Sequence, residues 1–375
     1  MLRSAHRRAA FRRGTAFLLA LLLVSVKAGA QSADLLPGMP ALLDPHDVYA
    51  ADRPGNLSPA VRGFPERVYV PNSGAGTVDV IDPHTFKIVD HFAVGKQPQH
   101  VVPSYDLKTL WVLNDLGDSL TRIEPATGRK LETIHVRDPY NMYYTPDGKY
   151  AIVVAEAQHR LDFRDAQTMK LVDSVAVRCR GIDHMDFAAN GRYLIASCEF
   201  SGELIKVDVA THIALGTLKL PEHAMPQDVR LTPDGSIFYV ADMMGNGVHL
   251  IDGDAFKTVG FVPTGKGTHG LYFSRDSTWL YVSNRGEGTI ALIDVRTRTL
   301  ATKWTIPGGG SPDMGGVSPD GKVLWLSGRY NAEVYALDTA DGHLLARIPV
   351  GKGPHGLCVY PQPGRYSLGH TGNMR

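Results

Sequence analysis

The sequence predicts an all-β protein, a seven-bladed β-propeller of four-stranded antiparallel blades closed by the C-terminal strand. Residues 268–294 show the repeating unit most clearly. They form an apolar run, a polar turn, a run of β-branched and aromatic residues, a glycine-rich turn, and a third run that ends in aspartate. The third run and its final acid recur along the chain at nearly constant spacing, which makes the protein a repeat protein.

The recurring acid gives the length of the repeat. Its spacings are 42, 41, 43, 44, 42 and 44 residues, the period of propeller blades, whereas helical solenoids would show a 3.6-residue periodicity. The acids are Asp82, Glu124, Asp165, Asp208, Asp252, Asp294 and Asp338. Seven such positions predict seven blades.

The two ends of the repeat region predict how the ring closes. The first repeat begins at its second strand, residues 67–70, while the last repeat leaves a first strand without a partner at residues 355–360. We expect this C-terminal strand to complete the first blade, so that no sheet edge stays open. The first hairpin of several blades has turn chemistry that tolerates positive φ in two-residue turns, in Asp147-Gly148, Asn190-Gly191, Asp234-Gly235 and Asp320-Gly321.

Residues 1–30 have the features of a signal peptide. Five arginines precede an apolar run at residues 16–26 that is too short to span a bilayer, and Ala28-Gly29-Ala30 is a cleavage site. Arg12-Arg13 also permits twin-arginine export, although ordinary secretion fits the later start of the apolar run. We expect a mature periplasmic or secreted chain that starts at Gln31. It would have an extended lead-in over residues 31–65, the propeller over 66–361 and a tail beyond the repeats over 362–375.

Composition and charge narrow the class of function. The chain is 43% hydrophobic and 21% charged, which suits a large core. Removal of residues 1–30 takes six basic residues away and leaves 33 Lys and Arg against 38 Asp and Glu, a net charge of −5. This charge disfavours a general polyanion binder, so there is no strong nucleic-acid signal, and the mature chain has no candidate membrane span.

Two motifs resemble those of the YVTN-repeat (YncE-like) seven-bladed propellers. The segments Val68-Tyr69-Val70-Pro71-Asn72, Tyr239-Val240-Ala241-Asp242 and Tyr281-Val282-Ser283-Asn284 resemble the tetrapeptide that names the family. The turns Thr145-Pro146-Asp147-Gly148, Thr232-Pro233-Asp234-Gly235 and Ser318-Pro319-Asp320-Gly321 resemble its first hairpin turn. The resemblance covers residues 66–360 and implies the fold. Related rings include amine dehydrogenase heavy chains, d1-haem domains and sugar lactonases, so the resemblance does not fix an activity.

Polar residues recur at the head of the first strand of every blade. Alignment on the hairpin acid gives the pairs Gln99-His100, Tyr140-Asn141, Asp183-His184, Gln227-Asp228, His269-Gly270, Asp313-Met314 and His355-Gly356. These strand heads converge on one mouth of the channel of a propeller. We expect metal ligands among His100, His184, His269, His355, Asp183, Asp228 and Asp313, and cofactor or ligand contacts from Asn141, Glu199, Arg285 and Arg329.

The chemistry of this mouth has two interpretations. Imidazole and carboxylate groups suit a transition metal such as Cu or Zn, or general acid-base work on an anionic or carbonyl substrate. Alternatively, a narrow wet channel needs polar residues to bind trapped water and satisfy strand ends. Loops between the second and third strands open on the same face and add Asn72, Asn114, Glu156, Asp242 and Asn284.

Three cysteines are present, and two of them allow alternatives. In an oxidising compartment Cys179 and Cys198 could pair, since they flank the first hairpin of one blade. The strand register places Cys198 opposite Asp183 instead, which leaves Cys198 as a soft copper ligand beside His184 as the other interpretation. Cys358 lies in the middle of a strand and is expected in the core.

The hypothesis that follows is an exported propeller that binds a small-molecule ligand, a metal or a protein partner at the channel mouth, without intrinsic turnover. The alternative is a periplasmic enzyme that uses the same mouth, either a lactone hydrolase or a metal-dependent redox protein. A third class, an interaction scaffold, would use the outer surface.

Export makes a direct prediction about the mature protein. Cleavage after Ala30 should leave Gln31 as the first residue of protein recovered from the producing cell. N-terminal sequencing checks this, and soluble cytosolic protein that keeps Met1 would contradict it.

Overall fold

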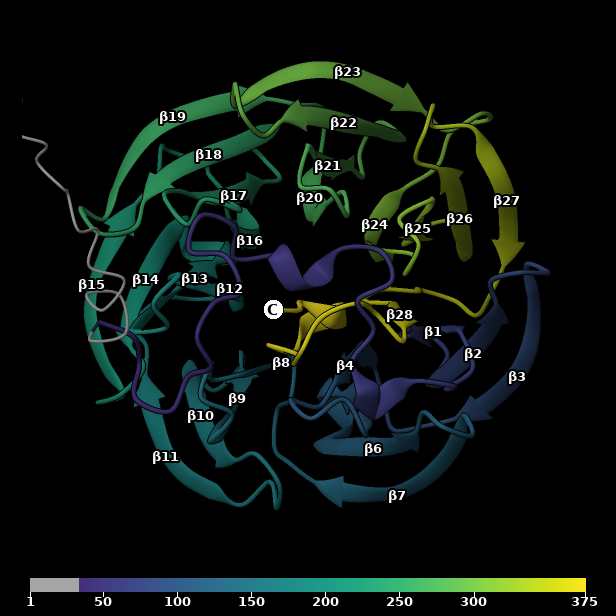
Figure 1. Cartoon of the computed structure of the whole chain (residues 1–375), viewed down its shortest axis with the longest axis horizontal. Coiled ribbons are helices and arrows are strands. Elements are labelled where there is room, and N and C mark those ends of the chain that lie inside the picture. Colours follow the sequence, from purple (N-terminus) through teal and green to yellow (C-terminus); the bar gives the residue numbers. More distant parts are fainter. Residues whose placement is uncertain (1–33) are drawn as a thin grey trace, which may run out of the picture. The chain divides into compact units, whose positions relative to one another are not determined.

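The computed structural model describes residues 34–375, and residues 35–375 form one compact unit (Figure 1). The expected signal peptide at residues 1–30, its cleavage site and the first residues of the lead-in lie outside the described residues. Over residues 35–375 the chain forms seven four-stranded antiparallel sheets arranged as the blades of a propeller, as predicted. No helix in this part of the chain is long and apolar enough to cross a membrane.

The first four blades are described from the channel outward. Blade 1 contains β28 (Cys358–Tyr360), β1 (Arg67–Asn72), β2 (Thr77–Asp82) and β3 (Lys87–Ala93). Blade 2 contains β4 (Pro98–Pro103), β5 (Leu110–Asn114), β6 (Ser119–Glu124) and β7 (Arg129–His135). Blade 3 contains β8 (Asn141–Tyr144), β9 (Tyr150–Ala155), β10 (Arg160–Asp165) and β11 (Leu171–Ala176). Blade 4 contains β12 (Ile182–Phe187), β13 (Tyr193–Cys198), β14 (Glu203–Asp208) and β15 (Ile213–Lys219).

The last three blades follow the same order. Blade 5 contains β16 (Pro226–Leu231), β17 (Phe238–Asp242), β18 (Gly247–Asp252) and β19 (Lys257–Pro263). Blade 6 contains β20 (Thr268–Phe273), β21 (Trp279–Asn284), β22 (Thr289–Asp294) and β23 (Thr299–Thr305). Blade 7 contains β24 (Pro312–Val317), β25 (Val323–Gly328), β26 (Glu333–Asp338) and β27 (Leu344–Pro349). The four strands of each blade are called A to D from the channel outward.

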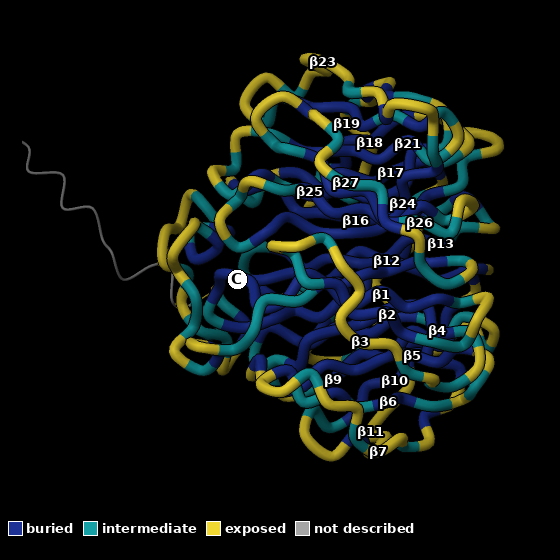
Figure 2. Tube along the Cα trace, turned by 90° about the vertical axis from the view of Figure 1, so that its right-hand side faces the viewer, coloured by how far each residue is buried: buried dark blue, intermediate teal, exposed yellow. Residues whose placement is uncertain are grey.

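Burial falls from strand A to strand D. Strand β4 is buried along its whole length, whereas the outer strand β3 is mostly exposed, and Figure 2 shows the same gradient from interior to edge. The hydrophobic core lies between neighbouring blades, as where Val248 of blade 5 and Val282 of blade 6 belong to one buried cluster. Each blade therefore needs its neighbour to bury its faces.

Blade 1 is built from both ends of the repeat region, as predicted. β28 pairs antiparallel with β1, with Val68 opposite Val359 and Tyr69 opposite Cys358. An additional bridge joins Asn72 to Pro354. This pairing closes the ring, and the buried Cys358 lies in the core as expected.

The A–B hairpins differ from the expected two-residue turns. Tyr144 ends β8 and Tyr150 begins β9, so five residues connect them. The Thr145 hydroxyl donates to Asp147 Oδ1 at 2.6 Å and accepts from the Tyr150 amide at 3.0 Å, while Gly148 has a φ of +71°. The Thr-Pro-Asp-Gly motif thus builds a wider turn that keeps the backbone bond from the Thr145 amide to the Tyr150 carbonyl, while the Thr145 hydroxyl and the Asp147 carboxylate accept the Tyr150 and Lys149 amides.

The lead-in and the tail cover the A–B hairpin end of the channel. The lead-in carries two short 3-10 helices, η1 (Ala50–Asp52) and η2 (Pro59–Val61), and its Tyr49 hydroxyl donates to the Leu231 carbonyl at 2.8 Å. The tail, residues 362–375, packs into the ring. Its residues are buried almost throughout, Arg375 lies 2.9 Å from Asp186, and η5 (His370–Gly372) lies inside the channel (Figure 1).

Ring closure predicts that the C-terminal segment carries much of the stability. Deletion of residues 353–375 should abolish cooperative unfolding, because it opens blade 1 and uncovers the channel. Differential scanning calorimetry of this variant beside the full mature chain measures the effect. A variant with the melting profile of the full chain would show that the β1–β28 pairing is dispensable.

Candidate functional site

In four blades the pair of residues at the head of strand A lies in a β-bulge. The pairing of strand A with strand B shifts register between Ile182 and Met185 in β12, and between Pro226 and Val229 in β16. The same shift occurs between Thr268 and Leu271 in β20, and between Pro312 and Gly315 in β24. A bulge sets two residues against one and re-aims their side chains. The pairs Asp183-His184, Gln227-Asp228, His269-Gly270 and Asp313-Met314 lie inside these bulges.

Five imidazole rings come together in the channel, and two of them, His184 and His269, lie in the bulges. The ring centroid of His100 lies 5.5 Å from that of His184, 4.8 Å from His355 and 5.3 Å from His370. His184 lies 4.8 Å from His370, and His269 lies 6.0 Å from His355. All four histidines predicted from the repeat are therefore in one cluster, and the tail adds His370 as a fifth.

The imidazole cluster is fully buried and does not line an open mouth. His100 and His184 are 0% exposed, and the other three rings are 2% exposed or less. Both ring nitrogens of His100 lack a hydrogen-bond partner within the described part of the chain, as do Nδ1 of His355 and Nε2 of His184 and His370. Buried polar atoms normally have partners, so this cluster has the character of a ligand site.

Asn141 lies between two of the rings. Its Nδ2 lies 3.0 Å from Nδ1 of His184 and 3.0 Å from Nδ1 of His370. The Tyr143 hydroxyl lies 3.3 Å from the same nitrogen of His184 and accepts from the Met185 amide at 3.1 Å. Asn141, which the sequence placed among the ligand contacts, thus orients two imidazoles at once.

A second group gathers around Asp313. Its Oδ1 lies 3.1 Å from Nδ1 of His269 and 3.1 Å from Nη1 of Arg285, and its Oδ2 lies 3.6 Å from Nε2 of His355. Met314 Sδ lies 3.1 Å from the same nitrogen of His269. Met314 is therefore part of the site, whereas the sequence alone could not separate it from packing methionines.

Two further carboxylates lie beside the rings. Asp183 Oδ1 lies 3.0 Å from Nε2 of His184, although the two atoms are not aligned as a hydrogen bond. Asp228 Oδ1 lies 3.6 Å from Nε2 of His370, and its two oxygens accept the amides of Val229 and Leu271 at 2.9 Å each. Asp228 therefore joins blade 5 to blade 6 and also faces the cluster.

Burial shifts the protonation of both kinds of group. It lowers the pKa of His100 to about 3 and holds the pKa of the other four histidines well below the usual range. Burial also raises the pKa of Asp228 to about 6, and burial with the nearby Glu199 raises the pKa of Asp183 well above its usual range. The imidazoles are neutral at pH 7, which is the form that binds a metal.

The loops between strands B and C divide into two sets. Arg285 pairs with Asp313, and Arg329 donates through Nη1 to the Ser73 hydroxyl at 3.0 Å and the Gly353 carbonyl at 3.3 Å. Glu199 and Glu156 raise the pKa of Asp183, and the charges of Arg285 and Arg329 act in turn on Glu199. The remaining candidates tie their own loops to neighbouring strands: Asn72 to Asp79, Asn114 to Thr121, Asn284 to Thr289, and Asp242 to His249.

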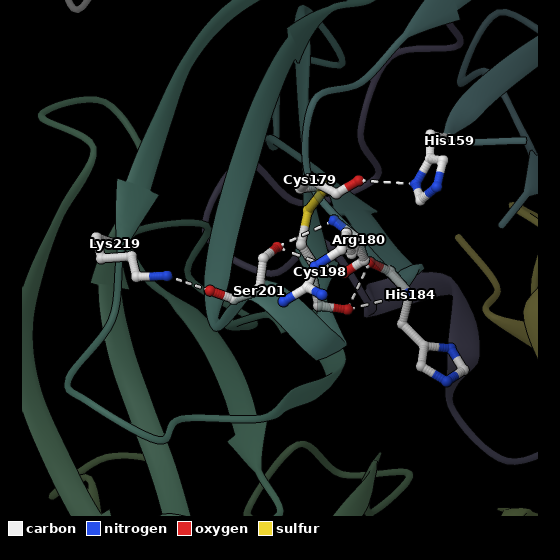
Figure 3. The surroundings of a disulfide bond; sticks show 8 residues. His159, Cys179, Arg180, His184, Cys198, Ser201 and Lys219 are labelled. Atoms are coloured by element: carbon white, nitrogen blue, oxygen red, sulfur yellow. Dashed lines mark hydrogen bonds between the residues drawn. A yellow bond between two sulfur atoms is a disulfide. The ribbon is translucent and has the colours of Figure 1, made fainter. Parts of the chain in front are cut away.

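Cys179 and Cys198 form a disulfide, with the two Cα atoms 5.9 Å apart. Cys198 is opposite Ile182, not Asp183, because the bulge lies after that pair. The interpretation of Cys198 as a copper ligand is therefore wrong. Figure 3 shows the bond beside His184, at the root of the bulge that carries Asp183 and His184, where it ties the loop before β12 to the end of β13.

Two sets of side chains have the spacing of metal ligands. Ligand atoms of His100, His184 and His370 all lie within 4.8 Å of one another, and so do those of His269, Asp313 and His355. Histidine nitrogen and carboxylate oxygen suit zinc, copper, nickel or iron. The residues present therefore fit a first-row transition metal.

Sequence reasoning missed three residues of the site. His370, Tyr143 and Arg230 all face the buried groups, but none occupies the repeated strand-head pair. Arg230 Nε lies 3.8 Å from Asp228 Oδ2. His370 is the hardest of the three to predict from sequence, because the tail that carries it lies outside the repeat and no spacing relates it to the other histidines.

A family model described as YNCE-like beta-propeller matches residues 56–364, and the chain belongs to that family. No curated protein sequence matches the chain significantly. The family assignment agrees with the resemblance found in the motifs, and it describes the fold rather than a reaction.

Solved structures with the same fold have low sequence identity. Hydrazine synthase of Kuenenia stuttgartiensis is 19% identical, with a TM-score of 0.64, over 81% of this chain and 99% of that chain. A proposed 6-phosphogluconolactonase from Bacteroides uniformis is 17% identical, with a TM-score of 0.65, over 78% and 98%. The dihydro-heme d1 dehydrogenase NirN, in complex with DHE, is 16% identical, with a TM-score of 0.59, over 85% and 78%. These likenesses establish the fold alone.

The packing around His100 predicts one sharp substitution effect. A Cβ atom on Gly356 would lie 2.0 Å from Nδ1 of His100, so Gly356→Ala should displace the ring and lower the free energy of unfolding by about 1–3 kcal/mol. Gly216→Ala is the matched control, since its nearest contact would be Phe256 at 4.0 Å. Chemical denaturation of both variants measures the difference. Equal stabilities would mean that His100 is not held against Gly356.

Proposed function

We propose that this YNCE-like β-propeller is an exported protein that binds one divalent transition metal ion, copper or zinc, through His100, His184 and His370. One observation carries the proposal. The three imidazoles come from two blades and the tail, approach within ligand spacing, and leave four of their six ring nitrogens without a hydrogen-bond partner in the described residues. Export rests on the signal-peptide features of residues 1–30.

A bound metal accounts for the unpartnered nitrogens. A buried polar atom without a partner costs about 1–3 kcal/mol, and four such atoms in one place call for a ligand. Water could satisfy some of them, but three convergent neutral imidazoles form the preferred donor set for zinc or copper. The lowered pKa values of these histidines also favour metal binding, because the rings are neutral and need not lose the proton of an imidazolium before they bind.

Asn141 decides which nitrogen of His184 and His370 binds. A metal on Nε2 requires a proton on Nδ1, and both Nδ1 atoms face the amide of Asn141. The amide oxygen can accept those protons only if the amide group turns over, which gives up the hydrogen bond that this oxygen accepts from the Met142 amide at 2.8 Å. Asn141 would then act on both ligands as the partner that fixes ring orientation and tautomer.

The surrounding charges favour a metal ion at His100, His184 and His370 over one at His269, Asp313 and His355. Two carboxylates, Asp228 and Asp183, lie beside His370 and His184 with one guanidinium, Arg230, 3.8 Å from Asp228, and the excess of negative charge stabilises a dication. Asp313 already pairs with the guanidinium of Arg285, which occupies the same oxygen that faces His269. We therefore assign the metal to His100, His184 and His370.

Three protein ligands leave an open position on the metal. Structural zinc sites are closed by four protein ligands, whereas sites that bind an exogenous molecule keep one position free. Lactone hydrolysis or redox turnover, the enzymatic alternative, would need this same position. Binding without turnover is the simpler proposal, since it requires only the ligands already described.

Calorimetric titration of metal-free mature protein tests the proposal. We expect one Cu(II) or Zn(II) ion per chain, and a loss of at least about 100-fold in affinity for His100→Ala and for His370→Gln. His370→Gln keeps a polar side chain in the tail, so it separates ligand loss from loss of packing. Electron paramagnetic resonance of the Cu(II) protein should show hyperfine coupling to several nitrogens.

His223→Ala is the matched control, because its side chain is 82% exposed and lies outside the channel set. It should bind metal like the unmodified protein. Melting temperatures of all variants verify that each is folded. Unchanged affinity in both His100→Ala and His370→Gln would refute the assignment.

A further inference from the structure

The buried cluster has two electrically different halves. Asp183 and Asp228 lie beside His184 and His370, and Arg230 lies 3.8 Å from Asp228, so two carboxylates and one guanidinium border these rings. Arg285 and Arg329 lie on the side of His269 and His355, where their positive charges contribute to the lowered pKa of both rings. The halves therefore prefer ligands of opposite charge.

The positive half also has an unsatisfied buried ring nitrogen. His355 Nδ1 lacks a hydrogen-bond partner within residues 34–375, and as an N–H it can donate to an anion. Arg329 uses Nη1 for Ser73 and Gly353, which leaves its Nε and Nη2 edge without a protein partner among the described residues. That edge of a guanidinium presents two parallel donors, the geometry that binds an oxyanion through two hydrogen bonds.

We propose that the half lined by His269, His355, Arg285 and Arg329 binds a small oxyanion, such as a carboxylate group, next to the metal at His100, His184 and His370. The inference rests on the proposed metal site and names the class of ligand that completes it. The anion would accept hydrogen bonds from Arg329 and from His355 Nδ1. It would also take the open position of the metal.

A second metal ion fits this half poorly, although His269, Asp313 and His355 have ligand spacing. Arg285 lies 3.1 Å from Asp313 Oδ1, so a cation on that oxygen would meet a guanidinium. The centroid of His100 lies 4.8 Å from that of His355, which puts the two groups side by side. Two dications and two guanidiniums would then repel in one buried space, whereas a dication and an anion attract.

Arg329 is the residue that separates anion binding from metal binding. Its hydrogen-bond partners Ser73 and Gly353 are neutral. The carboxylates on which its charge acts, Asp313 and Glu199, keep the charge of Arg285 in Arg329→Gln. Substitution of Arg285 would be a less specific test, because it would leave the buried Asp313 without the guanidinium that contacts it. Removal of the Arg329 charge should weaken the binding of an anion and slightly strengthen the binding of a cation.

The test uses full-length mature protein loaded with Cu(II) and titrated with azide as a spectroscopic anion, then with formate as a competing carboxylate. We expect a new absorption band from azide on copper, displaced by formate. Arg329→Gln should weaken both anions about tenfold or more while it binds Cu(II) at least as tightly as the unmodified protein. Arg329→Lys should recover part of the affinity.

Arg122→Gln is the control, since Arg122 pairs with Glu132 and both are exposed. It should change neither anion nor copper affinity. Normal copper binding with anion affinity unaffected by Arg329→Gln overturns the inference and leaves the metal proposal standing. Absence of copper binding in the unmodified protein overturns both.

Discussion

The antiparallel pairing of β1 with β28 is the contact on which both the ring and the buried cluster depend. It brings Val359 opposite Val68 and so completes blade 1 from the two ends of the repeat region. The segment that leads into β28 places His355 against His100, and the chain after β28 carries His370 back into the channel. Closure of the sheet and assembly of the site are therefore one event, because the C-terminal segment supplies two of the five rings.

The β-bulges explain how a regular strand offers two polar side chains to the same space. An unbulged strand would turn successive residues to opposite faces, and one member of each pair would enter the core between blades. In β12 the bulge lets Asp183 and His184 leave the ladder together, between Ile182 and Met185. The disulfide from Cys179 to Cys198 holds the base of this bulge. Backbone irregularity and the disulfide thus fix side chains that no hydrogen-bonded ladder would hold.

The fold could be predicted almost completely, and the site only in part. The repeating acid could be recognised in the sequence because each copy stabilises the turn that it begins. Asp165 and Asp208 accept amide and hydroxyl hydrogen bonds within the turns that they begin, so the spacing survives in the sequence. His100, His184, His269 and His355 could be found because they follow the same spacing. His370, the Arg285–Asp313 pair and the extent of burial depend on how the tail and the loops pack in three dimensions, and no period in the sequence records that packing.

The chemistry of the channel comes from departures from the repeat. Seven equivalent blades would give a ring of equivalent groups, with no reason for a cation and an anion to take separate positions. The acids near β12 and β13 and the arginines after β21 and β25 break that equivalence. The negative charge of Glu199 raises the pKa of Asp183, while the positive charge of Arg285 lowers the pKa of His269. The rings are neutral and gain a charge only at a cost in free energy, so the fixed charges around them set which ligand each half accepts. Proximity is therefore a property of the fold, and selectivity is a property of the few residues in which the blades differ.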